Sequence, residues 1–525
     1  MKRFKLFDHV SESPTRPHHD ERSKAFDVRD LTRGPFGQSQ EVRSEGLDEK
    51  LRKAYFWIVN HAIISPYYDI EYNDSPPRVL HFGDSQSPLS LPSDQSYSSF
   101  ILLPLLTFAA RRKCLFIGGP GRGKTASALL MGVLSGYSPK TVKRNMLHGH
   151  PQMTTADLLG NPLPADLMNA EQESDIRIAW RDWLAMRVKI VDEYNRIPTR
   201  TQSSLLTVLG DNYAEMFNQI YECPPSAWFL TANDDEGGGT YQVIDALKDR
   251  IDVAVQALAF NPRFLEDLLL RVEEGLDPAE LLPQSLVFSE QEQDELEAQI
   301  KSVVVPESVR RRLEFFASQF EFSEYSAHQF EYKSKDTSRL AGIPRHEVSL
   351  LEDGRDRLAE INCQTRNGLS VRSLMSLLVY AKAIAFFRGN QAVHLSDLRQ
   401  VLPFVLHIRL IPDHDAPFFQ QTENATYRSD RIGWLRHLFD LSCREFERQG
   451  RETSDPVAEL KRSLELGLSD VSLKECRARL QKIETELDRL SHGAKLNAGI
   501  YDDVLALKYM HQRYTNYLNW LVSNR

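Results

Sequence analysis

Hydrophobic positions in the first half of the chain alternate between short apolar runs and helical spacings. The runs over residues 114–117, 188–191 and 227–232 are apolar throughout, which is typical of strands buried on both faces of a parallel sheet. Residues 126–134 follow the first run with a helical pattern, and the alternation continues to about residue 260. This order of elements predicts an α/β fold with a parallel sheet.

The regions on either side of this segment have other patterns. Residues 8–46 are rich in Ser, Pro, Gly and charge and predict a flexible arm, which a helical spacing over 47–62 follows. Residues beyond 262 are mainly helical, with an irregular insert near 320–365. We expect four regions: an N-terminal extension at 1–95, an α/β domain at 96–261, a helical domain with the insert at 262–412, and a C-terminal helical region at 413–525.

The end of the chain has the clearest amphipathic pattern. A first apolar seam opens at a capping box formed by Ser472 and Glu475 and closes at Gly493, and a second seam follows it. The seams consist of Leu473, Cys476, Leu480, Ile483, Leu487 and Leu490, then Ile500, Val504, Leu507, Tyr514, Leu518 and Leu521. Two such helices predict a hairpin, which either packs onto its own domain or presents a docking surface to a partner.

The first apolar run leads into a glycine-rich motif between a strand and a helix. Residues 118–125 match the Walker A pattern, whose backbone N–H groups and helix N-terminus bind phosphate. We expect Lys124 to reach the β- and γ-phosphates of ATP, and the hydroxyl of Thr125 to bind Mg²⁺. The phosphate-binding segment consists of Gly118, Gly119, Pro120, Gly121, Arg122, Gly123, Lys124, Thr125 and Ala126.

Polar residues end the other two apolar runs. Asp192 and Glu193 follow the second run as a Walker B motif, in which Asp192 would hold Mg²⁺ and Glu193 would polarise the attacking water. Asn233 follows the third run and fits a sensor residue that orients this water. Ligands bind at the carboxyl ends of parallel strands, so the three motifs should converge on one crevice.

Several segments resemble the MoxR family of AAA+ ATPases. Residues 233–241, which end in an acidic, Gly-rich Thr-Tyr stretch, and residues 247–250, Leu-Lys-Asp-Arg, are similar to the family's sensor region. Residues 192–198 resemble its extended Walker B motif, and residues 368–374 and 397–410 resemble its lid. The resemblance implies an AAA+ P-loop core with a helical lid, to which this chain adds a C-terminal helical region.

The resemblance also implies roles for two arginines. Arg250 would be the arginine finger, which reaches the γ-phosphate held by the neighbouring subunit, and Arg372 would be sensor 2, which touches the same phosphate from the lid. A finger supplied by a neighbour requires a ring, and we expect a hexamer. The plain alternatives are a surface ion pair for Arg250 and a solvated helix position for Arg372.

Two insertions of this family are matched as well. Residues 157–184 have the features of the helix-2 insert, and residues 212–222 have the length of the pre-sensor-1 hairpin. In related motors such loops contact the substrate, although simple hairpin packing explains them equally well. The candidates for substrate contact are Leu167, Met168 and Phe217. His148 and His150 beside the first insertion are expected to be structural or solvated.

Composition limits the function classes. The chain has 525 residues, of which 41% are hydrophobic and 26% charged, and its net charge is −9 without a long basic block, which argues against a dedicated nucleic-acid binder. Five dispersed cysteines with no C-x-x-C pair indicate neither a zinc site nor a disulfide framework. No secretory signal or span-length apolar segment is visible, so we expect a cytoplasmic protein.

These patterns predict an ATPase that hydrolyses ATP in a ring and remodels, activates or matures a partner protein. A von Willebrand factor A-domain protein is the partner that the resemblance implies. An ATP-gated scaffold or regulatory switch is the alternative. A nucleic-acid motor is a weaker third reading, because acidic residues outnumber basic ones in the first insertion: Asp166, Glu171, Glu173 and Asp175 against Arg177 and Arg181.

Overall fold

The computed structural model describes residues 46–523, apart from 66, 84–87, 170–175, 234–244, 260, 274, 276, 343–360, 453–454, 470 and 494–495. The predicted arm at 8–46 therefore lies outside the described residues except for Gly46. The same holds for most of the acidic stretch at 233–241, and for the part of the 320–365 insert from 343 to 360.

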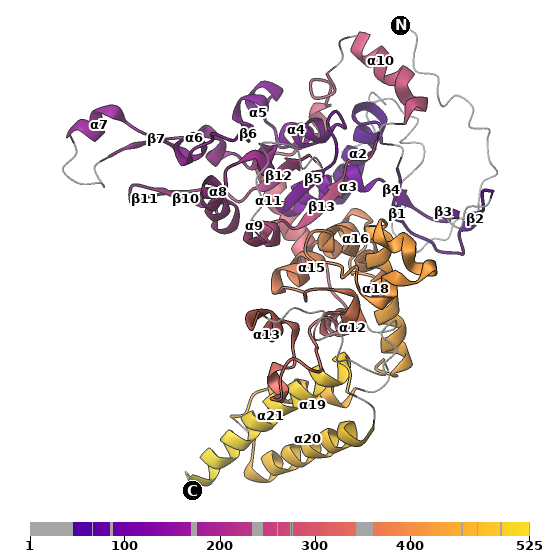
Figure 1. Ribbon diagram of the computed structural model, residues 1–525. Helices are drawn as coiled ribbons and strands as arrows, with labels where there is room; N and C mark the ends of the chain where they lie inside the picture. The colour runs from indigo at the N-terminus through magenta and orange to yellow at the C-terminus, as the bar shows by residue number, and fades with distance from the viewer. Residues whose placement is uncertain are drawn as a thin grey trace. The chain divides into compact units, whose positions relative to one another are not determined.

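A five-stranded parallel sheet forms the centre of the α/β core (Figure 1). Its strands are β5 (Lys113–Ile117), β6 (Leu147–His148), β9 (Val188–Asp192), β12 (Ala227–Ala232) and β13 (Val253–Gln256), in the spatial order β13-β5-β12-β9-β6. Strand β12 lies between the Walker A and Walker B strands, because Leu230 pairs with Leu115 on one side and with Val191 on the other. The three strands predicted from apolar runs are confirmed, and their carboxyl ends share one edge.

Helices cover the sheet, and α3 is the most buried of them, since all its residues are buried. The core helices are α3 (Ser99–Ala110), α4 (Lys124–Leu134), α5 (Pro139–Asn145), α8 (Thr199–Asp211) and α9 (Asp245–Arg250). The predicted helix over 47–62 is confirmed as α2 (Leu47–Trp57), which continues as a short π-helix (Ile58–Ala62). Two small antiparallel pairs follow it: β1 (Ile70–Glu71) with β4 (Ser96–Tyr97), and β2 (Arg78–Leu80) with β3 (Leu89–Leu91).

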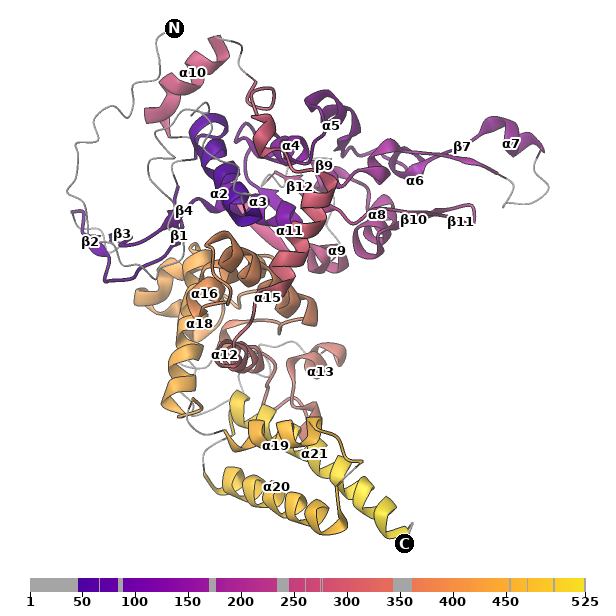
Figure 2. The same cartoon turned by 180° about the vertical axis from the view of Figure 1, so that it is seen from behind.

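Both predicted insertions are hairpins that extend from the same side of the core (Figures 1 and 2). The first contains α6 (Thr155–Leu159), β7 (Gly160–Pro162), α7 (Pro164–Asn169) and β8 (Ile178–Trp180), and the second contains β10 (Tyr213–Met216) and β11 (Gln219–Glu222). The rings of Trp180 and Tyr221 lie 5.5 Å apart, and Nε2 of Gln219 donates to the carbonyl of Ile176 at 2.5 Å. The hairpins therefore support each other.

The lid shares one hydrophobic core with α2, α3 and a face of the sheet. Its helices, together with those that lead into it, are α10 (Leu265–Glu273), α11 (Glu290–Ser302), α12 (Glu307–Ser318), α13 (Lys335–Leu340), α15 (Val371–Phe387), α16 (Leu395–Leu406), α17 (Pro417–Gln420) and α18 (Arg431–Arg448). Thr107 of α3 and Tyr380 of α15 are both buried, with their hydroxyl oxygens 2.6 Å apart. Helix α18, which also lies beyond residue 412, contributes Trp434 and Leu438 to this same core.

The C-terminal hairpin is confirmed as α20 (Leu473–Gly493) and α21 (Ala498–Ser523), which pack with α19 (Pro456–Glu465) around a separate small core. The Oγ of Ser472 accepts a bond from the N–H of Glu475 at 3.2 Å, as its predicted capping role requires. Tyr501 packs on Phe322 of the insert, with ring centroids 5.0 Å apart. Packing onto its own chain is thus observed, while Trp520 near the end of α21 is exposed. Among the described helices, none is both long and apolar enough to span a membrane.

Candidate active site

The Walker A loop follows β5 and bends sharply against the end of β13. Gly118 has a φ of 151°, and a Cβ atom there would lie 2.5 Å from the carbonyl oxygen of Ala257. Only glycine fits this close approach. Arg122 also joins the loop to this segment, because its Nη1 donates to the carbonyl of Ala257 at 3.0 Å.

Lys124 begins α4 and is buried at the centre of the site. Its Nζ donates to the carbonyls of Gly118 and Gly119, the latter at 2.7 Å, and to Oδ1 of Asn233 at 2.9 Å. The ammonium group is therefore held at the mouth of the loop by oxygen acceptors. These are groups that a phosphate oxygen can replace, since an ammonium binds phosphate as a compact point charge.

Asp192 ends β9 beside the first turn of α4. Its Oδ1 accepts bonds from Thr125 at 3.0 Å and from Thr231 at 2.5 Å. Thr231 is buried and also accepts a bond from the backbone N–H of Glu193 at 2.9 Å, so it holds the Asp192 carboxylate and the Glu193 backbone. Sequence reasoning missed Thr231, although a signal was present: it precedes Asn233 by two residues, and such residues face the same side of a strand.

Glu193 adopts a left-handed backbone conformation, with φ at 53°. This conformation is costly for a residue with a side chain and is often found at functional sites. Oε1 of Glu193 accepts a bond from Nδ2 of Asn233 at 3.1 Å, and Oε2 lies 3.2 Å from Nη1 of Arg196. Gly149 permits this backbone, because a Cβ there would lie 2.3 Å from the carbonyl of Glu193.

His148 also touches the Walker B motif. It ends β6, pairs in register with Asp192, and places Nδ1 3.5 Å from Oδ2 of that residue while staying 66% exposed. The expectation of a structural or solvated histidine agrees with this exposure. Its position opposite Asp192 follows from sheet register, which the sequence did not provide.

The residues present fit a nucleotide with Mg²⁺. The loop from Gly118 to Gly123 wraps Lys124, and the hydroxyl of Thr125 and the carboxylate of Asp192 are the hard oxygen ligands that Mg²⁺ takes alongside phosphate oxygens. The part of the chain that the structure describes contains no cluster of three or more His, Cys, Asp and Glu side chains suited to a metal. An ion bound mainly through phosphate and water needs no such cluster.

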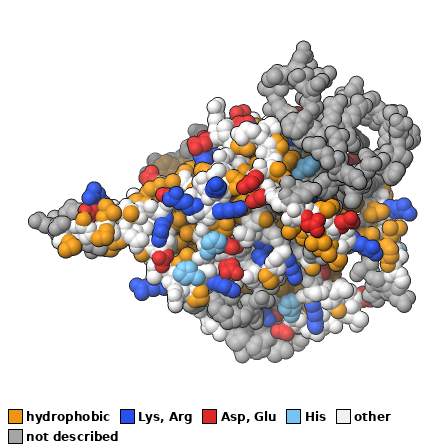
Figure 3. Space-filling model, turned by 90° about the horizontal axis from the view of Figure 1, so that it is seen from above, with side chains coloured by type: hydrophobic (Ala, Val, Ile, Leu, Met, Phe, Trp, Pro, Cys, Tyr) orange, Lys and Arg blue, Asp and Glu red, His pale blue; other side chains and the backbone are white. Residues whose placement is uncertain are grey.

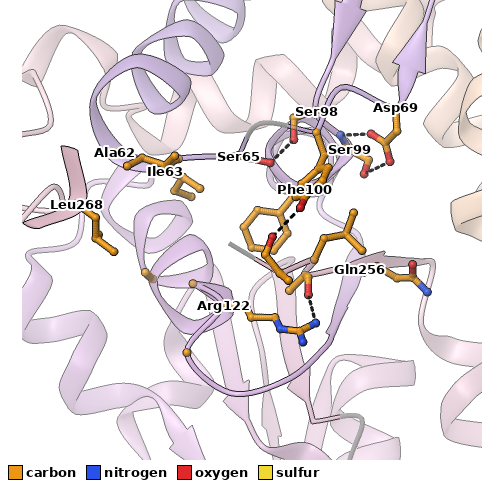
Figure 4. Close-up of a pocket in the computed structure, with 18 of the residues that line it drawn as sticks. Ala62, Ile63, Ser65, Asp69, Ser98, Ser99, Phe100, Arg122, Gln256 and Leu268 are labelled. Carbon is orange, nitrogen blue, oxygen red and sulfur yellow. Dashed lines mark hydrogen bonds between the residues drawn. The ribbon is translucent and has the colours of Figure 1, made fainter. Parts of the chain in front are cut away.

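A cavity of about 370 Å³ opens beside the Walker A loop (Figure 4). Part of its wall is the loop itself, at Gly121 to Gly123, and part is the segment after α2, which the sequence did not connect to the site. The lining residues outside the loop include Ile63, Ser65, Tyr67, Phe100, Gln256, Leu268, Phe404 and Ile432. The wall is mainly apolar, as in sites that hold a planar ring. Among the described residues, four parts of the chain therefore meet here: the N-terminal extension, the core, α10 and the lid.

The two predicted arginines lie next to each other. Arg372, at the start of α15, pairs with Asp249 at 2.9 Å and is 57% exposed, and Asp249 directly precedes Arg250. Nε of Arg250 is buried without a hydrogen-bond partner among the described residues. Within those residues, neither arginine bonds to the Walker motifs of its own chain. The surface ion pair considered for Arg250 is therefore not seen among the described residues. Arg372, considered for a solvated helix position, is the arginine that pairs with Asp249.

The hairpins expose apolar side chains. Met168 on α7 is 86% exposed and Phe217 in the β10–β11 turn is 38% exposed, whereas the side chain of Leu167 lies outside the described ones. Viewed from above, the part of the molecule that projects to the left carries hydrophobic side chains. Acidic and basic groups are interspersed on the face in view (Figure 3). Arg177 in the first insertion pairs with Asp166 at 2.9 Å, which removes a free cation from a nucleic-acid surface.

The chain is similar in sequence to known proteins. The AAA lid domain family matches residues 358–429. The chaperone MoxR1 of Mycobacterium tuberculosis (strain ATCC 25618 / H37Rv) is 22% identical over 228 residues, which are 43% of this chain and 51%, about half, of the relative's length.

Two solved structures are also similar, at low TM-scores. A protein described as a "putative ATPase" from Cytophaga hutchinsonii ATCC 33406 has 18% identity and a TM-score of 0.44, covering 64% of this chain and 89% of that one. A full-length MCM homolog from Methanopyrus kandleri has 14% identity and a TM-score of 0.33, covering 59% of this chain and 55% of the other.

The parallel sheet, the P-loop and the lid match define an α/β AAA+ core with a helical lid and further C-terminal helices. Together with the similarity to MoxR1, they support the resemblance to MoxR-type AAA+ ATPases that the sequence motifs predicted.

Proposed function

We propose that this protein binds ATP with Mg²⁺, hydrolyses it in a ring of identical subunits, and uses the cycle to remodel, activate or mature a partner protein. One observation carries the proposal. Lys124, Asn233 and Glu193 form a continuous hydrogen-bonded chain, with bonds of 2.9 and 3.1 Å, at the mouth of the Walker A loop. The side-chain amide of Asn233 therefore links the lysine proposed to bind phosphate to the carboxylate proposed to activate water.

The roles of the residues follow from their atoms. Lys124 holds the β- and γ-phosphates, and Asn233 orients a water molecule between Lys124 and Glu193, which polarises it. Mg²⁺, bound by Thr125 and Asp192, would supply charge neutralisation at the phosphates. The apolar cavity beside the loop holds the base, and little covalent chemistry is left to the protein, so positioning dominates.

The position of Arg250 supports the proposed ring of subunits. Among the described residues, Arg250 forms no hydrogen bond or ion pair with the Walker motifs of its own chain. If Arg250 is the transition-state arginine, it would therefore act in the site of a second copy. Arg372 lies beside Arg250 and would enter the same neighbouring site. A hexamer, and a von Willebrand factor A-domain partner, rest on the resemblance to MoxR proteins.

The second candidate, an ATP-gated switch, is favoured by the contacts of Glu193. Both carboxylate oxygens are engaged, by Asn233 and by Arg196, so the group is held away from a substrate water. Slow turnover that a partner accelerates would suit a switch. Under this alternative, Arg196→Ala would release Glu193 and raise the basal rate several-fold, whereas a constitutive remodeller would show little change.

The client is best found with a trapped variant. Glu193→Gln should keep ATP bound and hold any client, and Lys124→Ala provides the matched control that cannot bind ATP. A stoichiometric protein that co-purifies with the first variant and not the second supports an ATP-gated remodeller. Recovery of the bare protein from its native cell in both cases would favour the self-contained switch.

A further inference from the structure

The guanidinium of Arg250 lies directly against α8 at Gly210. A Cβ atom on Gly210 would lie 2.3 Å from Nε of Arg250 and 3.1 Å from its Cδ and Cζ atoms. Any side chain at position 210 would therefore displace the guanidinium, since packed atoms do not approach so closely. Because Nε of Arg250 is buried without a hydrogen-bond partner among the described residues, shape rather than pairing orients this side chain.

A second arginine, Arg409, fixes the backbone beside Arg250 from the lid. Its side chain is buried, with Nη2 donating to the carbonyl of Asp249 at 2.9 Å and Nη1 donating to the carbonyl of Arg372 at 3.3 Å. One forked guanidinium thus joins the residue before Arg250 to the other candidate arginine. Lysine has one ammonium group and cannot reproduce this fork.

The side chain of Asp249 strengthens the same junction. Ser370 donates to its Oδ1 at 2.7 Å, and Arg372 pairs with its Oδ2. Although burial opposes ionisation, the hydrogen bonds from Ser370 and Arg372 and the charge of Arg409 hold the pKa of Asp249 below its usual value. Helix α9 is therefore tied to the start of α15 and to the end of α16 as one unit.

We propose that Gly210 and Arg409 are positioning residues for Arg250, and that Arg409 couples the lid of one subunit to hydrolysis in its neighbour. This deepens the proposed function, because it rests on Arg250 acting in the adjacent site. The path from the nucleotide cavity to Arg250 is short. Phe404 of α16 lines the cavity, and Arg409 follows the end of the same helix. Arg409 donates to the carbonyl of Asp249, the residue before Arg250. A lid that moves with its own nucleotide would carry the finger with it.

The test measures ATP turnover and ATP affinity for Gly210→Ala and Arg409→Met, each alone and combined with Arg250→Ala. Each single variant should lower kcat at least tenfold with KM for ATP within threefold of the parent. In the Arg250→Ala background neither should lower kcat further, because both act through the missing side chain. Full additive losses in that background would overturn the proposal.

Fold damage is controlled in two ways. Alanine is more favourable than glycine inside a helix, so Gly210→Ala should not unfold α8. Arg311→Met is the matched control for Arg409→Met, because Arg311 is also a mostly buried arginine that donates to a carbonyl, of Arg451, and it pairs with Asp455 far from the site. This control should keep kcat within twofold of the parent, and an equal loss in both arginine variants would overturn the positioning role.

Subunit mixing separates this proposal from the proposed function. Chains with Arg409→Met keep an intact Glu193, so mixing them with Glu193→Gln chains, which keep an intact Arg250, should restore turnover. Mixing Arg250→Ala chains with Glu193→Gln chains tests whether Arg250 acts in the site of a neighbouring subunit. Recovery with Arg250→Ala but not with Arg409→Met overturns the inference alone, whereas no recovery with Arg250→Ala overturns the finger in trans and the proposed function with it.

Discussion

Asn233 donates from Nδ2 to Oε1 of Glu193 at 3.1 Å, and its Oδ1 accepts from Lys124 at 2.9 Å. One amide thus uses both of its functional atoms to join the phosphate-binding lysine to the carboxylate that would activate water. The strand order makes this possible, because β12 lies between β5 and β9 and places Asn233 between the two Walker motifs.

Asn233→Ala should lower kcat by about 100-fold and leave ATP affinity within a few-fold, because it removes a group that acts mainly on the attacking water. Steady-state phosphate release and equilibrium ATP binding check the two parts separately. Thr201→Ser in α8 is a suitable control, since its hydroxyl bonds the carbonyl of Met153 outside the site. Turnover within threefold of the parent in Asn233→Ala would contradict the sensor role.

Lys124→Ala should weaken ATP binding by about 100-fold or more, because several charge-assisted hydrogen bonds to phosphate are lost together. Titration with a fluorescent ATP analogue measures this. Lys140→Ala, at an exposed position in α5, is the matched control and should bind as the parent does. Unchanged affinity in Lys124→Ala would mean that the loop does not hold the phosphates.

Tyr67→Ala should raise KM for ATP three- to tenfold with little change in kcat, because Tyr67 lines the cavity assigned to the base and is distant from the reacting phosphate. Its hydroxyl donates to the carbonyl of Ala259 at 2.8 Å, and the residue is 39% exposed, so the fold should tolerate the loss of its side chain. Tyr325→Ala in the insert is the control. A change confined to kcat would place the base elsewhere.

Acid should destabilise the fold through His407. Burial, assisted by the charge of Arg431, lowers the pKa of His407 to about 4, from an ordinary value near 6.5. The unfolded chain binds this proton first as pH falls, so the neutral histidine contributes its full stability above pH 6.5 and loses it between about 6.5 and 4, by at most about 3 kcal/mol. Urea denaturation across this range should show that the free energy of unfolding falls less steeply with falling pH in His407→Gln than in the parent. Identical pH dependences would contradict the low pKa of His407.

The strands and their shared carboxyl edge could be predicted from the sequence, because their signals are local. An apolar run that ends in Asp192 and Glu193, or in Asn233, defines both a strand and its carboxyl end, and the Walker A pattern fixes the turn and helix that follow. The insertions and the terminal hairpin were predictable for the same reason, since hairpin lengths and apolar seams are read within a few tens of residues.

The remaining features depend on contacts between distant segments. The cavity joins Ile63 to Phe404, the lid joins Arg409 to Asp249, and His148 meets Asp192 only through sheet register. No periodicity in the chain encodes such pairs. The division into four regions stays a prediction, and the packing of α18 with the lid core shows why a boundary near residue 412 is hard to place from helix spacing alone.

ATP hydrolysis by assembled subunits is best tested by measuring phosphate release and bound ATP together, for the parent chain and for Glu193→Gln over a range of protein concentrations. The parent should release phosphate with a specific activity that rises as subunits assemble. Glu193→Gln should retain about one ATP per chain while its release falls at least 100-fold. Equal release by the two proteins, or a parent that binds ATP and releases no phosphate at any concentration, would contradict the proposed hydrolysis.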